Sequence, residues 1–282
     1  MEQFAAGWIR HYYGKGDVTV YRLHRTKVPA GASPVFGANV KMLVYGDAFW
    51  PTYTTGDNTG LIATDSMKNF IQRETLAYEG ASLEDLCRFL ADRFLAKYPQ
   101  VEGIQVSAEE VPYAPLPQRV GFAPSGPERA IARVEMTRQR IADATCGLHG
   151  FRLLRLGGSA FHGFVRDEYT TLPDLKDRPL HMWLDVDWRC TAPERAFDQT
   201  ERGARIRALV HEVFESVESG SIQQVIYQMA TRMLEVLPEL AEVHLEANNR
   251  TWDTIAEQGD ALGVYTDPRP PYGCLGLRLT RS

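Results

Sequence analysis

The chain has 282 residues, of which 44% are hydrophobic and 24% are charged, and its formal net charge is −5. This composition is typical of a folded protein of about two domains, and it excludes a disordered chain, a collagen-like chain and a disulfide-stapled fold. The negative charge gives no electrostatic reason to expect a nucleic acid as partner, and no run of about 18 apolar residues predicts a transmembrane helix.

The chain begins with two predicted strands. Residues 17–24 and 39–45 are rich in β-branched and aromatic side chains, which favour an extended backbone. Residues 46–60 are rich in glycine, aspartate and threonine and predict a loop.

Two helices and another strand are predicted next. Thr64 opens a segment whose apolar residues recur at helical spacing. Ser82 and Asp85 form a start like a capping box for a second helix, with an apolar face below it. Residues 101–111 alternate between apolar and polar side chains and predict a strand, and a proline-rich stretch follows.

The second half of the chain repeats this order of elements. Strands are predicted at residues 130–139, 150–157, 178–190, 243–245 and 275–279. Two helices lie between the third and fourth of these strands. One is amphipathic from Ile206 onward, and Ser221 caps the other.

Each half therefore runs from strands through two helices to strands, although no internal sequence repeat is visible. Strand pairs that are neighbours in sequence predict antiparallel sheets with helices on one face, an α+β class. Such a sheet has a free face, for which self-association is the simplest expectation.

Several chemical motifs are absent from the sequence. It contains no nucleotide-binding glycine loop, no H-E-x-x-H, no paired C-x-x-C and no G-x-S-x-G. Cys146 and His149 have half-site spacing for zinc, but a turn with a buried thiol explains them more simply. Four scattered cysteines and no secretory signal predict reduced thiols and a cytoplasmic location.

Three strings of residues carry more specific information. They are Tyr13-Gly14-Lys15, then A-T-D-S-M-K-N at residues 63–69, then F-H-G-F-V-R-D-E-Y-T-T-L at residues 161–172 with Asp177-Arg178 after it. In this order and spacing they closely resemble the urate oxidase (uricase) family, over nearly the whole chain from residue 13.

The resemblance implies a fold and a reaction. The fold is two tandem tunnelling-fold domains, expected at residues 1–127 and 128–282, and four chains form a tunnel with sites at subunit interfaces. The reaction oxidises urate with O2 and water to 5-hydroxyisourate and hydrogen peroxide, without a metal or organic cofactor. The implied partners are urate, O2 and three further copies of the chain, with no nucleic acid or membrane.

Urate is a flat, polar anion, so its site needs an aromatic platform and planar donors. Phe161 matches the family's stacking phenylalanine; by itself it could be a core residue. Arg178 matches the arginine whose guanidinium fork grips the pyrimidine edge, which a lysine would not replace; the alternative is an arginine in solvent. Gln223 matches the glutamine that clamps the same edge; the alternative is an exposed residue in the first turn of a helix.

Lys15 and Thr64 match the family's catalytic pair, in which the lysine is the base and the threonine hydroxyl relays the proton. A lysine acts as a base only when neutral, a form that burial or a nearby positive charge favours; the alternative is a surface lysine in a turn. Thr64 could also be a helix N-cap, and both roles can coexist. Asp65 would donate its backbone N–H to urate.

The resemblance also implies a site shared between chains. Lys15, Thr64 and Asp65 come from one chain and the urate-gripping residues from its neighbour, so a monomer would be inactive. Leu172 and Ile222 match residues that contact the ring through apolar or backbone atoms, and either could be a core residue.

Two residues near the C-terminus belong to the oxygen side of the site. Asn248 matches the asparagine that holds O2 or the attacking water; the alternative is a turn residue. Arg250 stands where many family members have a histidine that completes the relay, and arginine cannot release its proton. Arg250 could favour neutral Lys15 by charge repulsion or point into solvent, and His244 could replace the histidine in space.

Three functions follow from these residues. The first is a cofactor-free urate oxidase. The second, suggested by Arg250, is a tunnelling-fold protein that binds urate or another purine without turnover. The third is a pterin enzyme of the same fold, which would need a zinc held by histidines or cysteines, and the sequence has no such cluster. We expect the first.

Overall fold

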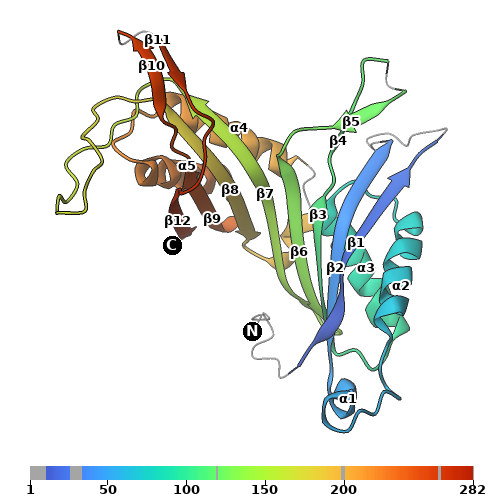
Figure 1. The fold of residues 1–282 in the computed structure, drawn as a ribbon. Helices are drawn as coiled ribbons and strands as arrows, with labels where there is room; N and C mark the ends of the chain where they lie inside the picture. The colour runs from blue at the N-terminus through green and yellow to red at the C-terminus, as the bar shows by residue number, and fades with distance from the viewer. Residues whose placement is uncertain (1–10, 26–33, 119, 198–200, 260–261, 282) are drawn as a thin grey trace. The chain divides into compact units, whose positions relative to one another are not determined.

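The computed structural model describes residues 11–25, 34–118, 120–197, 201–259 and 262–281 (Figure 1). The chain divides into two compact units. The first unit is Met1–Gly147 with Arg189–Glu201, and the second unit is Leu148–Trp188 with Arg202–Ser282. Each contains neighbouring strands and a pair of helices, which confirms the predicted α+β class.

The first unit is built on an antiparallel sheet. Its strands are β1 (Tyr13–Leu23), β2 (Val35–Tyr45), β3 (Gly103–Glu110), β6 (Arg129–Thr137) and the first part of β7 (Ile141–Arg155). β1, β2, β3 and β6 pair antiparallel in this order. The strands predicted in this part of the chain are confirmed, and β1 and β2 begin earlier than expected.

Two helices, α2 (Thr64–Ala77) and α3 (Leu83–Lys97), pack against this sheet (Figure 1). The Ser82 hydroxyl accepts a hydrogen bond from the Asp85 N–H at 3.3 Å, which confirms the predicted cap of α3. α3 buries Leu86, Leu90 and Phe94 among its apolar residues. Burial of each such side chain stabilises the fold by about 1.5–3 kcal/mol.

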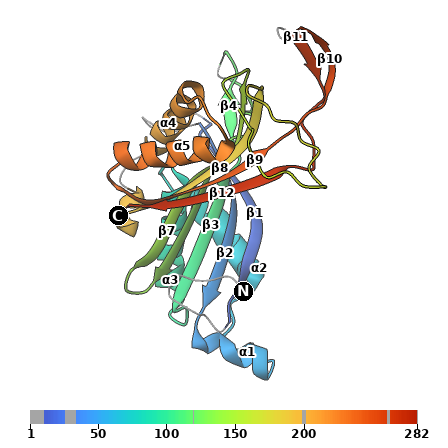
Figure 2. The ribbon, with the colours of Figure 1, turned by 90° about the vertical axis from the view of Figure 1, so that its left-hand side faces the viewer.

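The second unit repeats this plan. Its strands follow the order of the rest of β7, then β8 (Leu180–Cys190), β9 (Leu240–Asn249) and β12 (Gly273–Thr280). Every second residue of β8 is buried, as its alternation predicts. The helices α4 (Arg202–Ser216) and α5 (Ile222–Val236) pack on each other, and α5 packs on β9 and β12 (Figure 2).

Several short elements differ from expectation. The loop predicted at residues 46–60 is wrong in part, because η1 (Asp47–Phe49) and α1 (Trp50–Thr54) form there around the buried Phe49 side chain. Two small hairpins were not predicted: β4 (Tyr113–Pro115) with β5 (Phe122–Pro124), and β10 (Thr254–Gln258) with β11 (Leu262–Tyr265). The short helix η2 (Pro193–Phe197) follows β8. None of the helices in the described part of the chain is both long and apolar enough to cross a membrane.

Candidate functional site

Lys15 lies on β1 beside an irregularity of the sheet. Its Cα is paired with that of Met42 on β2, but the register shifts between Lys15 and Val18, and Asp17 has a φ of 58°. A bulge of this kind bends a strand and re-aims the side chains next to it. The Asn39 amide donates a hydrogen bond to Oδ1 of Asp17 at 2.7 Å, which holds the bulge.

The two residues before this lysine have clear structural roles. The Tyr13 hydroxyl accepts a hydrogen bond from the Ile62 N–H at 3.0 Å, so the start of β1 is tied to the segment that leads into α2. Burial raises the pKa of Tyr13 to about 12, so its hydroxyl stays protonated. A Cβ at Gly14 would collide with the carbonyl oxygen of Met42, so only glycine fits this close approach.

Thr64 and Asp65 form the exposed first turn of α2, which packs on β1. The N-cap is Ala63, so the alternative of Thr64 as the N-cap is wrong by one position; Thr64 is already helical. The Met67 N–H donates to the Ala63 carbonyl at 3.2 Å, and the N–H groups of residues 64–66 precede this first helical bond. Such a turn attracts anions.

The carboxylate of Asp65 is engaged on its own helix. Lys68 Nζ donates to Oδ1 of Asp65 at 2.6 Å, and Asn69 Nδ2 donates to Oδ2 at 2.9 Å. The Lys68 hydrogen bond and charge lower the pKa of Asp65, with smaller contributions from Asn69 and Lys15. Because α2 packs on β1, the first unit places Lys15, Thr64 and Asp65 on neighbouring elements.

In the second unit, Phe161 lies in a loop that is held at its backbone. Its N–H donates to the Leu175 carbonyl at 2.8 Å, and the Leu175 N–H donates back at 2.9 Å. Its ring stacks on that of Phe164, with centroids 5.0 Å apart and an interplanar angle of 17°. The residue is only half-buried, so the alternative of an ordinary core phenylalanine is wrong.

Three segments meet at the base of this loop. The Ala160 N–H donates to the Ser219 carbonyl at 2.7 Å, and the Ser219 N–H donates to the Gly158 carbonyl at 3.1 Å. Oδ1 of Asp177 accepts from the Gly158 N–H at 2.7 Å and from the Ser159 N–H at 3.3 Å. These bonds join the aromatic platform, the residue before the predicted arginine and the turn that leads into α5.

Arg178 lies beside the platform. Its guanidinium carbon is 5.6 Å from the centroid of the Phe161 ring. Burial lowers the pKa of Arg178, but an arginine stays charged at neutral pH. Its Nε is buried and has no hydrogen-bond partner among the described residues. A half-buried cation with an unused donor favours an anionic ligand that can accept from it.

The other residues predicted to contact urate differ in how far their side chains are exposed. Ser221 caps α5 by accepting from the Gln224 N–H at 3.2 Å, so Gln223 lies exposed in the first turn of the helix. Ile222 is 3% exposed and its side chain belongs to the core. Leu172 is 42% exposed, so the core alternative is wrong for this residue.

Asn248 and Arg250 lie at the end of β9. Asn248 is within the strand, paired with Cys274 of β12, and not in a turn. The guanidinium carbon of Arg250 is 3.9 Å from the ring centroid of Trp183 and 3.9 Å from that of Tyr272. Arg250 is therefore held between two aromatic rings and does not point into solvent, and each cation–π contact contributes about 0.5–2 kcal/mol.

His244 has its own partner. Its Nδ1 is 3.6 Å from Oδ2 of Asp187, and His149 Nε2 lies 2.9 Å from Oδ1 of the same carboxylate. Burial raises the pKa of Asp187, but the two histidines outweigh burial, so the net shift is downward. His244 lies about 20 Å along the strand from Arg250. The expectation that His244 takes the place of the family's histidine is therefore wrong.

Comparison with known proteins agrees with the family that these motifs indicate. The family model for uricase matches residues 11–135 and 144–275. The chain belongs to the uricase family. It is 39% identical to a uricase of Haloferax volcanii in an alignment that covers 96% of this chain and 98% of that protein.

Two further relatives agree with this assignment. The chain is 38% identical to a uric acid degradation bifunctional protein of Bacillus sp. TB-90, and it spans 60% of that protein's length. A crystal structure of urate oxidase from Bacillus sp. TB-90 superposes with a TM-score of 0.87 at 37% identity, covering 96% of this chain and all of that one.

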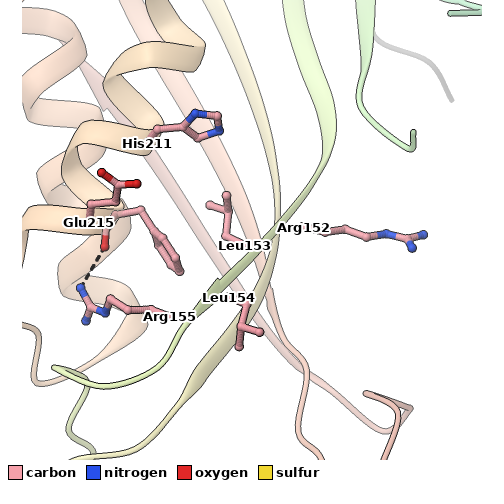
Figure 3. A pocket seen from close by; sticks show the side chains of 7 residues that line it. Arg152, Leu153, Leu154, Arg155, His211 and Glu215 are labelled. Carbon is pink, nitrogen blue, oxygen red and sulfur yellow. Dashed lines mark hydrogen bonds between the residues drawn. The ribbon is translucent and has the colours of Figure 1, made fainter. Parts of the chain in front are cut away.

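The uricase-family strings contain residues predicted for the site, but not all of the residues that hold these in place. Asp177 directly precedes Arg178, so its position was visible in the sequence although its role was not. Arg155 Nη1 donates to the Phe214 carbonyl of α4 at 2.9 Å (Figure 3). No sequence signal indicated this contact, because its two partners are far apart in the chain.

One hollow of about 410 Å³ in the described part of the second unit is lined by Arg152, Leu153, Leu154, Arg155, His211, Phe214 and Glu215, and by none of the predicted site residues (Figure 3). Cys146 and His149 lie within β7 and not in the expected turn, and Cys146 is buried and forms no disulfide in the described part of the chain. Across the described residues, no group of three or more His, Cys, Asp or Glu side chains could hold a metal ion.

Proposed function

We propose that this uricase-family chain is a urate oxidase. The reaction removes two electrons from urate and reduces O2 to hydrogen peroxide, while water supplies the hydroxyl group of 5-hydroxyisourate. The observation that supports it most directly is the pairing of Arg178 with Phe161, a half-buried cation with an unused donor beside an aromatic platform.

Substrate binding follows from this pair. The urate ring lies on Phe161, and the guanidinium fork of Arg178 donates to its pyrimidine edge. Gln223 clamps the same edge with its amide, and Leu172 and the backbone of Ile222 contact the ring. Gln223 lies exposed in the first turn of α5, so its side chain is available to a ligand.

Proton transfer is assigned to Lys15 and Thr64. The neutral amine of Lys15 accepts a proton that the Thr64 hydroxyl passes on from urate or water. The Asp65 N–H, at the N-terminus of α2, donates to the substrate anion. The bulge at Asp17 and the packing of α2 on β1 support this grouping.

Asn248 holds O2 or the attacking water above the ring. Arg250 is not a proton relay in this chain, because an arginine does not give up its proton. Its place between Trp183 and Tyr272 supports the role of a fixed positive charge near the end of β9. The relay then consists of Lys15, Thr64 and solvent.

We assign two tandem tunnelling-fold domains, residues 1–127 and 128–282, of which residues 1–10, 26–33, 119, 198–200, 260–261 and 282 lie outside the described part. Four chains form the tunnel, and each site takes Lys15 and Thr64 from one copy and Arg178 from its neighbour. The protein acts in the cytoplasm without a cofactor, a location supported by its four cysteines, none of which forms a disulfide in the described part of the chain.

Oxygen uptake tests the activity. Purified, chelator-treated protein is expected to consume O2 when urate is added and to release an equal amount of peroxide. If urate binds but no oxygen is consumed, the protein is a purine-binding member of the family without turnover.

Mixing two inactive variants tests the shared site. Lys15→Ala and Arg178→Ala chains are each expected to be inactive. In random mixed oligomers about a quarter of the sites would contain both intact residues, if neighbouring copies supply them. No regained activity in mixed oligomers would show that one chain supplies both residues.

A further inference from the structure

Asp65 stands where its own charge opposes the proposed chemistry. It is the second residue of α2, in the turn whose N–H groups would bind the urate anion. A carboxylate at a helix N-terminus interacts with the same partial positive charge that attracts an external anion.

Two side chains in the next turn of α2 compensate the negative charge of Asp65. Lys68 Nζ lies 2.6 Å from one oxygen of Asp65, and Asn69 Nδ2 lies 2.9 Å from the other. These spacings of three and four residues place all three side chains on one face of the helix. Both carboxylate oxygens are thus occupied within the helix, and the Lys68 ammonium cancels the charge.

We propose that Lys68 is a positioning residue of this active site: by holding and neutralising the Asp65 carboxylate, with Asn69 in support, it keeps the N-terminus of α2 available to an anionic substrate. This inference rests on the proposed urate oxidase function.

The test compares Lys68→Met, Lys68→Arg and Asp65→Asn. Lys68→Met leaves Asp65 without its ammonium partner, so the KM and the anaerobic dissociation constant for urate each rise about fivefold. Lys68→Arg keeps the charge and behaves like the unmodified protein. Asp65→Asn removes the competing carboxylate, so both values fall.

The double variant Asp65→Asn with Lys68→Met is expected to return both values to within about twofold of the unmodified protein. Asp85 and Arg88 provide a matched control, because they form the same type of pair, at 2.5 Å, in the first turn of α3. Arg88→Met is expected to leave the KM and the dissociation constant for urate unchanged.

The inference is wrong if Lys68→Met leaves both values unchanged, or if the double variant keeps the defect. If Lys68→Met does not fold, Asp65→Asn decides the question through its opposite shift. Failure of the proposed function is a separate outcome, seen as no oxygen uptake by the unmodified protein; anaerobic urate binding by Lys68→Met then decides the inference.

Discussion

Replacing Arg178 by lysine tests whether the guanidinium fork binds the substrate. Arg178 lies with its guanidinium carbon 5.6 Å from the Phe161 ring, and its Nε is buried without a partner among the described residues. Lysine keeps the positive charge but replaces two parallel N–H donors with one ammonium group. The variant therefore removes the planar pair of N–H donors but keeps the positive charge.

The expected loss is one charge-assisted hydrogen bond. Such a bond contributes about 1.5–3 kcal/mol, which corresponds to binding weaker by about tenfold to 150-fold. Loss of the cation–π contact with Phe161 adds at most about 1 kcal/mol at a partly exposed site.

The assay is titration of the protein with urate in the absence of O2, so that binding is measured without turnover. The control is Arg232→Lys, because Arg232 lies exposed on α5 and donates to Glu212 at 3.1 Å, outside the proposed site. The control should bind urate normally. A dissociation constant for Arg178→Lys within twofold of the unmodified value would refute the assignment of Arg178 as the clamp.

Three further outcomes are expected. Lys15→Ala should lower kcat for oxygen uptake by about a hundredfold or more, with a smaller effect on anaerobic urate binding; near-normal kcat would remove Lys15 from the mechanism. Gly14→Ala should lower the free energy of unfolding by about 2–3 kcal/mol, because its Cβ meets the Met42 carbonyl. Gly276→Ala, with open space around it, should change that energy by less than about 1 kcal/mol in the same urea titration. The pKa of Asp187 is lowered in the fold, so its stabilisation is complete above about pH 4 and is lost as the pH falls through the lower folded value. Asp187→Asn should therefore lose stability relative to the unmodified protein at about pH 6 and match it near about pH 2, and a constant difference would contradict this linkage.

The elements that the sequence predicted best are those with local signals. α3 and α5 begin directly after Ser82 and Ser221. The hydroxyl of each serine accepts a hydrogen bond from the backbone N–H three residues later. β8 shows strict alternation because every second residue of the strand is buried. Both signals depend on neighbours in the chain, so they are visible without a tertiary structure.

The elements that were missed lack such signals. All residues of β10 are exposed, so no alternation of buried and exposed residues marks the strand. β7 begins at Ile141, well before the predicted start, because its pairing with other strands extends a segment that has little alternation of its own. The bulge at Asp17 depends on the register between β1 and β2, which the composition of β1 does not reveal.

By itself, the sequence determined the α+β class, the order of strands and helices, the family, and the residue types that a urate site needs, because these depend on local pattern and on three long strings. Only the tertiary structure decided how those residues are held. In the structure, the Phe161 loop is hydrogen-bonded to Asp177 and Ser219. Arg250 lies between the rings of Trp183 and Tyr272, and His244 lies beside the carboxylate of Asp187. These contacts join residues from different strands and loops, so they exist only after the sheet register has brought distant parts of the chain together.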